Sequence, residues 1–235
     1  MLQKLLLSSL VVGFITGIFI TFFHLSLIKP IIDKAEVHEL SSSTMLTETY
    51  NGHHHSAEDD SNQNHNAVNK YIFGHSLERT IFSFISNIII ATGFSFLFSS
   101  VLTLIKNDIN IKSVFIIGFF GFLSFCLLPS ISLSPQPPGT LSASLELRQF
   151  IWVLISFCSI VGLAFLFYKK GIIWRIISFV ILIIPHIIAI LVIKSIPISN
   201  VPSDLISNFV YSTIISGALL WFTLSILMNY FYKKL

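Results

Sequence analysis

Six apolar segments constrain the fold of this chain more than any other feature. They cover residues 5–28, 80–105, 113–129, 150–168, 172–193 and 207–232. About 20 apolar residues in a helix cross the roughly 30 Å hydrocarbon core of a bilayer. Each segment is predicted to be a helix, because an open sheet edge cannot satisfy its backbone groups in lipid. The predicted fold class is therefore an all-α integral membrane protein with about six transmembrane helices in a single membrane domain.

The composition supports membrane insertion. Hydrophobic residues make up 54% of the chain and charged residues only 11%, against about 25% charged in soluble proteins. The formal charge of +3 is no argument for a nucleic-acid partner, because basic residues beside membrane helices usually set their orientation. Membrane lipid is the expected surrounding.

The first apolar segment is predicted to be a retained helix rather than a cleaved signal peptide. Its length exceeds the 7 to 15 residues of a signal-peptide core, and it lacks a small-x-small cleavage site. Within it, Gly13 and Gly17 form a GxxxG pattern. Such a pattern lets a neighbouring membrane helix approach closely.

The placement of charge predicts the orientation. With six spans, one side of the membrane holds a single acidic residue, Asp108, and these basic residues: Lys4, Lys106, Lys112, Lys169, Lys170, Arg175, Lys233 and Lys234. Short loops rich in Lys and Arg are typically cytoplasmic. Both termini are therefore predicted in the cytoplasm, and the connection at 29–79 is predicted outside.

Histidines gather on the predicted outer side. The long connection carries a polar middle, 41–70, which we expect to be a mobile loop without a core of its own. Imidazole and carboxylate groups are common ligands of divalent transition metals. The candidate metal ligands are His24, His38, His53, His54, His55, His65, His75, His186, Asp33, Glu36 and Glu39.

Two interpretations of this loop stay open. It captures metal ions, or it is a solvated histidine-rich linker. Consecutive histidines at 53–55 cannot all reach one ion in an extended strand, because alternate side chains point apart. The spacing also does not match a structural zinc site.

Pro185 and His186 form a second candidate feature, inside the fifth apolar segment. A proline within a helix removes one backbone hydrogen bond and frees a carbonyl one turn earlier. An ionisable side chain beside such a kink is a candidate metal ligand or proton carrier. The alternative is a neutral histidine bonded to a neighbouring helix.

A proline-rich connection forms the third outer feature. Four prolines and one glycine fall within 129–139, and they are expected to exclude regular helix and to form a stiff turn or re-entrant cap. Glu146 and Arg148 follow it, and we expect their partners at Glu78 and Arg79; the alternative is that both arginines extend to the interface alone. The candidate structural or gating residues are Glu78, Arg79, Pro135, Pro138, Gly139, Glu146, Arg148 and Pro185.

Motifs of soluble catalysis are missing from the sequence. It contains no GxxxxGK[ST] phosphate loop, no HExxH helix and no GxSxG elbow. The sequence therefore predicts no enzyme, and energy from ATP would have to enter through another protein chain.

An ordered set of short segments resembles the CbtA family of cobalt transporter subunits along nearly the whole chain. These segments lie at 30–39, 74–80, 118–122, 135–139, 147–152, 185–186 and 201–205. The resemblance implies membrane passage or delivery of cobalt, with His38, His186, Asp33, Glu36 and Glu39 at matching positions. It also implies a partner, a small CbtB-like protein that spans the membrane once and bears its own histidines.

The chain departs from the family pattern in two places. Gln136 stands where the family usually has Glu, so a carboxylate is lost from the proline loop. The residues after Pro185 and His186 are Ile187-Ile188-Ala189-Ile190 in place of small residues, which weakens close packing there.

The function expected from these observations is uptake of cobalt, or of a related divalent metal, as one membrane subunit in the cytoplasmic (inner) membrane of a bacterium. Outward-facing His, Asp and Glu would capture Co(II), and no permanently bound cofactor is expected. Imidazole and carboxylate sites do not by themselves separate cobalt from nickel, zinc or copper. The alternative function is a non-transporting membrane scaffold or metal sensor that acts through a partner.

Overall fold

The computed structural model describes the whole chain apart from residues 1, 51–60, 106–109, 194–197, 200 and 233–235. Within helices and strands it leaves the side chains of 2, 4, 40–50, 61–76, 141, 198 and 232 undescribed. Six helical segments are long and apolar enough to cross a membrane, which confirms the predicted fold class. They are Leu5–Glu39, Leu77–Leu104, Ile111–Ser132, Leu145–Tyr168, Ile172–Val192 and Ser203–Phe231.

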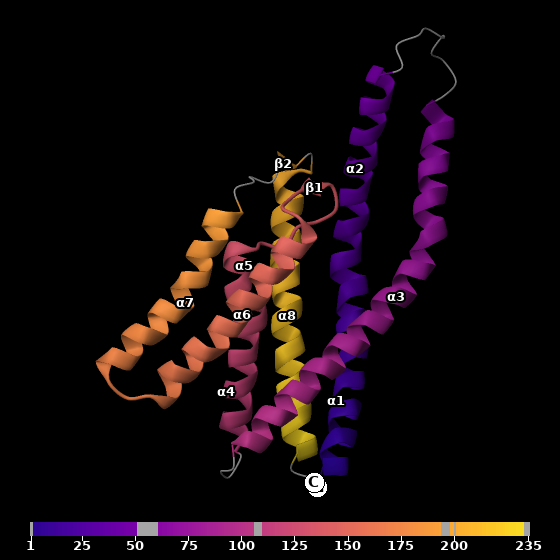
Figure 1. Cartoon of the computed structure of the whole chain (residues 1–235). Helices are drawn as coiled ribbons and strands as arrows, with labels where there is room; N and C mark the ends of the chain where they lie inside the picture. The colour runs from indigo at the N-terminus through magenta and orange to yellow at the C-terminus, as the bar shows by residue number, and fades with distance from the viewer. Residues whose placement is uncertain (1, 51–60, 106–109, 194–197, 200, 233–235) are drawn as a thin grey trace.

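The first two spans belong to very long helices. Helix α1 (Leu2–Phe23), a π-helical turn η1 (His24–Ile28) and α2 (Lys29–Tyr50) form one rod, and α3 (Ser61–Leu104) crosses it (Figure 1). Helix therefore covers 41–50 and 61–70, within the segment that we expected to be a mobile loop without a core of its own. The physical reason is cooperativity, because extending a helix that is already nucleated in the membrane requires no new nucleus.

The remaining spans complete the bundle. The third consists of α4 (Ile111–Phe122), the π-helical turn η2 (Leu123–Leu127) and α5 (Leu128–Ser132). Helices α6 (Leu145–Tyr168) and α7 (Ile172–Val192) form a hairpin that leans away from α4 at its turn, and α8 (Ser203–Tyr232) stands between α4 and α1 (Figure 1). The start of α1 and the end of α8 lie at the same end of the bundle.

Both π-helical turns stand just before a proline. In η1 the Lys29 N–H donates to the His24 carbonyl, one residue before Pro30, and in η2 the Leu128 N–H donates to the Leu123 carbonyl, one residue before Pro129. A proline ring clashes with the carbonyl four residues earlier. The wider turn relieves that clash, so the helix continues through each proline. Our expectation that the four prolines of 129–139 exclude helix was thus wrong for Leu128–Ser132.

The GxxxG pattern is where α1 and α3 touch. A Cβ added to Gly13 would lie 2.4 Å from the Cα of Thr92, and one added to Gly17 would lie 2.6 Å from the Cα of Ile88. Close approach of α1 and α3 is therefore confirmed. Small residues at every fourth position of α1 extend this contact in both directions, at Ser9, Gly13, Gly17 and Thr21. Ser9 Oγ donates to Ser99 Oγ over 2.8 Å, which ties the helices together one turn below Gly13.

An aromatic core joins α3, η2 and α8. The rings of Phe125 and Trp221 stack with centroids 5.8 Å apart, and Phe94 meets both. Aromatic pairs of this kind add to the packing that holds membrane helices together when lipid removes most of the hydrophobic driving force. This core fixes α8 against the crossing helix α3.

Candidate functional site

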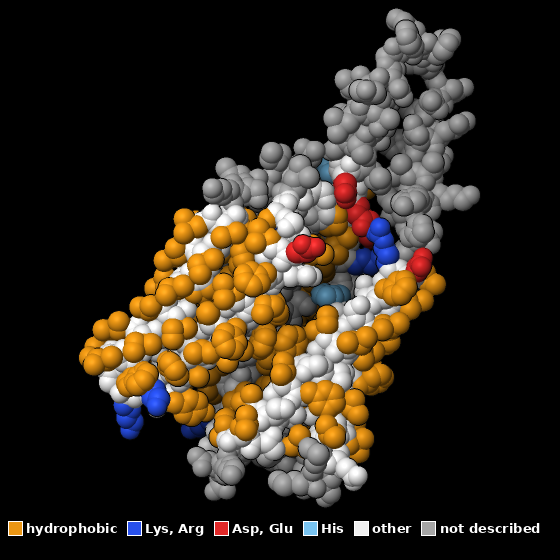
Figure 2. Space-filling model, in the orientation of Figure 1, with side chains coloured by type: hydrophobic (Ala, Val, Ile, Leu, Met, Phe, Trp, Pro, Cys, Tyr) orange, Lys and Arg blue, Asp and Glu red, His pale blue; other side chains and the backbone are white. Residues whose placement is uncertain are grey.

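Charged side chains divide between the two ends of the bundle. All acidic side chains that the structure describes lie at one end, which we call the acidic end: Asp33, Glu36, Glu39, Glu78, Glu146 and Asp204. The opposite end, called the lysine end, carries Lys112, Lys169, Lys170 and Arg175. Figure 2 shows red and blue side chains together at the upper end, an apolar surface below them, and blue side chains at the lower left.

Two polar contacts join α2 to α3 at the acidic end. Arg79 Nη1 donates to Glu36 Oε1 over 2.5 Å in a salt bridge. The Glu36 side chain is 16% exposed and that of Arg79 is 56% exposed, so the carboxylate is the sheltered partner. Nearer the start of α2, Lys29 Nζ donates to Thr80 Oγ1 over 3.1 Å. These contacts hold the two long helices in register where they leave the apolar region.

Arg148 has other partners than those we expected. Its Nη1 donates to Gln136 Oε1 over 2.5 Å and its Nη2 donates to the Ser134 carbonyl over 3.2 Å. The expectation that Arg148 pairs with Glu78 or Arg79 was therefore wrong. The proline loop folds back on the start of α6, and two of its oxygen atoms accept hydrogen bonds from the Arg148 guanidinium. Gln136 accepts one of these hydrogen bonds through its amide oxygen.

The proline loop is a stiff cap over α2. Gly139 has φ +81°, a conformation that side chains disfavour, and a Cβ there would lie 3.3 Å from Glu39 and 3.2 Å from Val201. Thr140 Oγ1 donates to the Pro137 carbonyl over 2.8 Å. The strands β1 (Thr140–Leu141) and β2 (Ile198–Ser199) then pair antiparallel, with Thr140 opposite Ser199. The cap thus links α2, the start of α6 and the approach to α8.

His24 is held by a chain of hydrogen bonds that fixes which ring nitrogen carries the proton. Thr21 Oγ1 donates its single proton to the Gly17 carbonyl over 2.8 Å, so it accepts from Asn87 Nδ2 at 3.2 Å. The same Nδ2 lies 3.1 Å from His24 Nδ1 and donates its second proton there. A neutral His24 therefore has its proton on Nε2, and its one lone pair is already occupied by Asn87.

His186 has a different hydrogen-bonding environment. Its Nδ1 lies 2.7 Å from Ser132 Oγ at the end of α5, and the ring is half-buried directly after Pro185, which lies inside helix α7. A serine hydroxyl can accept as well as donate. When Nδ1–H donates to Ser132, the lone pair of Nε2 is left for a ligand, the pattern of metal-binding histidines whose second nitrogen is hydrogen-bonded.

The candidate ligands on α2 do not converge on one point by themselves. Asp33 and Glu36 are three residues apart and share a face, but His38 is two residues beyond Glu36 and lies on another. Across the part of the chain that the structure describes, no group of three or more His, Cys, Asp or Glu side chains has a metal-site arrangement. His53, His54 and His55 lie outside the described residues, and so do the side chains of His65 and His75 on α3.

Three residues that hold these histidines were missed by the sequence reasoning. They are Asn87 and Thr21, beside His24, and Ser132, beside His186. A signal existed for Asn87, because it is a single amide inside an apolar segment and such side chains usually bond across helices. No sequence signal marked Ser132, because it is one of several serines in the proline loop.

Comparison with known proteins assigns the family. The sequence model described as "Probable cobalt transporter subunit (CbtA)" matches residues 2–233. No curated protein and no solved structure matches this chain. A match over nearly the full length, on a bundle of six apolar helices, leaves one conclusion. The chain belongs to the CbtA family of probable cobalt transporter subunits.

Proposed function

We propose that this chain is the membrane subunit of a bacterial cobalt uptake transporter and that its acidic end meets the metal outside the cell. The observation that carries the proposal is the distribution of carboxylates along the bundle. Every described carboxylate lies at the acidic end, together with the basic residues Lys29, Lys34, Arg79 and Arg148, and none lies among the described residues of the lysine end. By the positive-inside rule the lysine end, with both termini, faces the cytoplasm. A cluster of carboxylates outside raises the local concentration of cations.

Capture by the acidic end would begin at α2. Asp33 and Glu36 share one helix face, and the Glu36 carboxylate already has a cationic partner, Arg79. A divalent ion has more charge than a guanidinium, so it can take the place of Arg79 at this carboxylate. Imidazole suits cobalt. Further nitrogen ligands would come from His38, His65, His75 and the histidines at 53–55.

His186 is the proposed ligand within the membrane. In the tautomer whose Nδ1–H donates to Ser132, Nε2 is the nitrogen that would face a metal ion, whereas the lone pair of His24 is engaged by Asn87. In this conformation His186, rather than His24, is therefore the ring that offers a lone pair to an ion. Cobalt is the cargo in this proposal, and no metal is bound permanently.

A second protein is part of the proposal because the described polar side chains between α1 and α3 bond to one another and offer no open path for a cation across the membrane. Ser9 bonds directly to both Ser95 and Ser99, and Gly13 touches the backbone of α3. No described carboxylate lies at the lysine end to continue a path for a cation. A small, histidine-bearing, single-span partner of the CbtB kind would complete the path.

Transport by proteoliposomes tests the proposal. Radioactive cobalt uptake is measured with this chain alone, with the single-span partner alone, and with both together. Uptake is expected only with both. Failure in every setting would instead assign the chain to a scaffold or metal sensor.

Calorimetric titration with Co(II) tests the capture step separately. The variant Asp33→Asn/Glu36→Gln is expected to bind Co(II) at least about tenfold more weakly than the wild type, since carboxylates are charged ligands for a divalent ion. Asp204→Asn, which changes an exposed carboxylate at the same end on α8, is the control and should bind as the wild type does. Equal affinity in both variants would remove α2 from the mechanism.

A further inference from the structure

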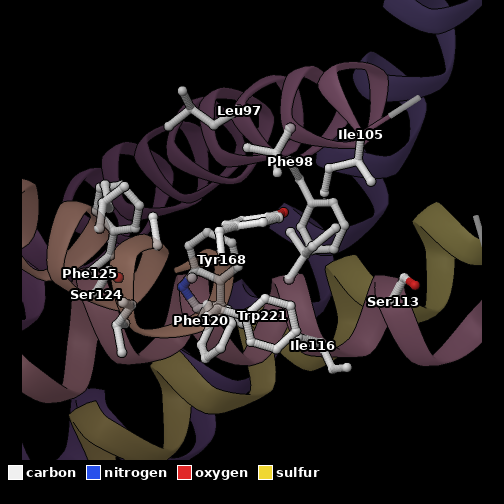
Figure 3. Close-up of a pocket in the computed structure, with 17 residues that line it drawn as sticks. Leu97, Phe98, Ile105, Ser113, Ile116, Phe120, Ser124, Phe125, Tyr168 and Trp221 are labelled. Atoms are coloured by element: carbon white, nitrogen blue, oxygen red, sulfur yellow. The ribbon is translucent and has the colours of Figure 1, made fainter. Parts of the chain in front are cut away.

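A cavity opens between α3, α4 and α6 in the half of the bundle next to the lysine end. Its volume is about 430 Å³, and its lining includes Phe98, Phe120, Phe167, Tyr168 and Trp221. Figure 3 shows Phe98 on α3, Phe120 on α4 and Tyr168 on α6 around the same space. Cavities of 300–1,000 Å³ are of the size that holds small ligands.

The cavity is open to the surroundings of the bundle. Leu97 is 51% exposed, Ile116 is 40% exposed and Phe167 is 58% exposed, although all three line it. The turn of the α6–α7 hairpin leans away from α4 at this level (Figure 1). At this depth the opening faces hydrocarbon, so the occupant must be apolar along most of its length.

Basic residues stand next to the cavity lining at the lysine end. Ser113 lines the cavity directly after Lys112, and Tyr168 lines it directly before Lys169, whose Nζ lies over the Trp174 ring, 5.2 Å from the ring centroid. No acidic side chain accompanies these lysines among the residues described at this end; Asp108 lies outside the description. Basic groups at a membrane surface attract anionic lipid headgroups. An apolar space beside the basic end of the bundle is complementary to a lipid with an anionic headgroup.

We propose that this cavity binds one acyl chain of an anionic phospholipid, whose phosphate lies between Lys112 and Lys169. A transmembrane helix does not fit, because a cylinder about 10 Å wide with this volume would be about 5.5 Å long, a single helical turn. The acyl chain fills the wedge between α3, α4 and α6 and so supports the diverging hairpin. This site is independent of the metal and of the proposed transport function.

Native mass spectrometry of the purified, delipidated full chain tests the proposal with phosphatidylglycerol and phosphatidylcholine of the same acyl chains. The wild type should bind one phosphatidylglycerol at least about fivefold more tightly than phosphatidylcholine. Val101→Trp, at the mouth, should weaken phosphatidylglycerol binding about tenfold or more. Val180→Trp is the matched control, because Val180 is similarly exposed, 47% against 40% for Val101, and does not line the cavity.

The lysines are tested one at a time. Lys112→Gln and Lys169→Gln should each weaken phosphatidylglycerol binding about fivefold, the factor that about 1 kcal/mol per basic residue gives. Lys34→Gln, an exposed lysine at the acidic end, should leave binding unchanged. Equal effects of the three substitutions would overturn the headgroup assignment.

Photo-crosslinking of the wild type removes the risk that a variant misfolds. A phosphatidylglycerol with a diazirine in its acyl chain should label peptides from α3, α4 and α6. If α7 is labelled as strongly as α3, α4 and α6, the proposal is overturned. Equal lipid binding by Val101→Trp and Val180→Trp would also overturn it. A dimer that Val101→Trp dissociates would assign the cavity to a second copy instead and also overturn it.

Discussion

Replacing Gly13 by Ala is the sharpest test of the close contact between α1 and α3. An added Cβ would lie 2.4 Å from Thr92 Cα, and ordinary contact begins near 3.4 Å, so the helices must separate by about 1 Å. Overpacking typically costs about 1–3 kcal/mol. The bonds from Ser9 to Ser99 and from Ser95 to the Ser9 carbonyl lie one turn away and would stretch, at about 0.6 kcal/mol each. Against this, Ala is about 1 kcal/mol better than Gly in a helix.

The net expectation is a loss of about 1–3 kcal/mol in the free energy of unfolding, measured by titration with denaturing detergent in mixed micelles. Gly93→Ala is the matched control, because a Cβ on Gly93 meets nothing within 4 Å. That variant should be unchanged or more stable by up to about 1 kcal/mol. If the two variants unfold alike, the helices do not touch at Gly13, and the packing argument fails.

Three further predictions concern the acidic end and its histidines. Gln136→Glu should stabilise the loop by up to about 1 kcal/mol, because a partly exposed ion pair with Arg148 replaces the amide contact; a lower melting temperature would contradict this. Glu36→Gln should cost less than about 1 kcal/mol, since its guanidinium partner is half exposed, and a larger loss in thermal unfolding would mean a buried role. Asn87→Leu should release His24 Nδ1, so that the ¹⁵N shifts of this ring change from the Nε2–H form toward a tautomer mixture; unchanged shifts would refute the hydrogen-bond chain.

Much of the fold follows from the sequence because hydrocarbon imposes strict rules on a chain. Long apolar runs predicted the six spans, and the GxxxG pattern at Gly13 and Gly17 pointed to close helix contact. The helix through Pro129 could not be foreseen, since its cause is a widened π-helical turn in η2 that only three-dimensional geometry reveals. The spans expected at 113–129 and 150–168 are longer in the structure, at 111–132 and 145–168. Polar residues can extend a helix beyond the apolar region, so apolar runs alone underestimate the length of a helix.

The candidate site was less accessible to sequence reasoning. Ligand types could be named from composition, but the partners of each side chain depend on crossing angles between helices. Arg148 bonds within its own loop, and His24 meets an amide from α3 that is 63 residues away in the chain. The hydrophobic periodicity of the sequence does not indicate which polar side chains will pair. The contrast between His24 and His186 therefore emerges only from the hydrogen-bond network.

The most direct test of the central claim is the accessibility of the acidic end from outside the cell. In a variant with Cys126 and Cys158 replaced by Ser, single cysteines are placed at Glu39 and at Lys112, on opposite ends of the bundle. A membrane-impermeant maleimide added to intact spheroplasts should label the cysteine at 39 and reach the one at 112 only after permeabilisation. Labelling of position 112, but not position 39, in intact spheroplasts would place the carboxylates in the cytosol and contradict capture of metal for import.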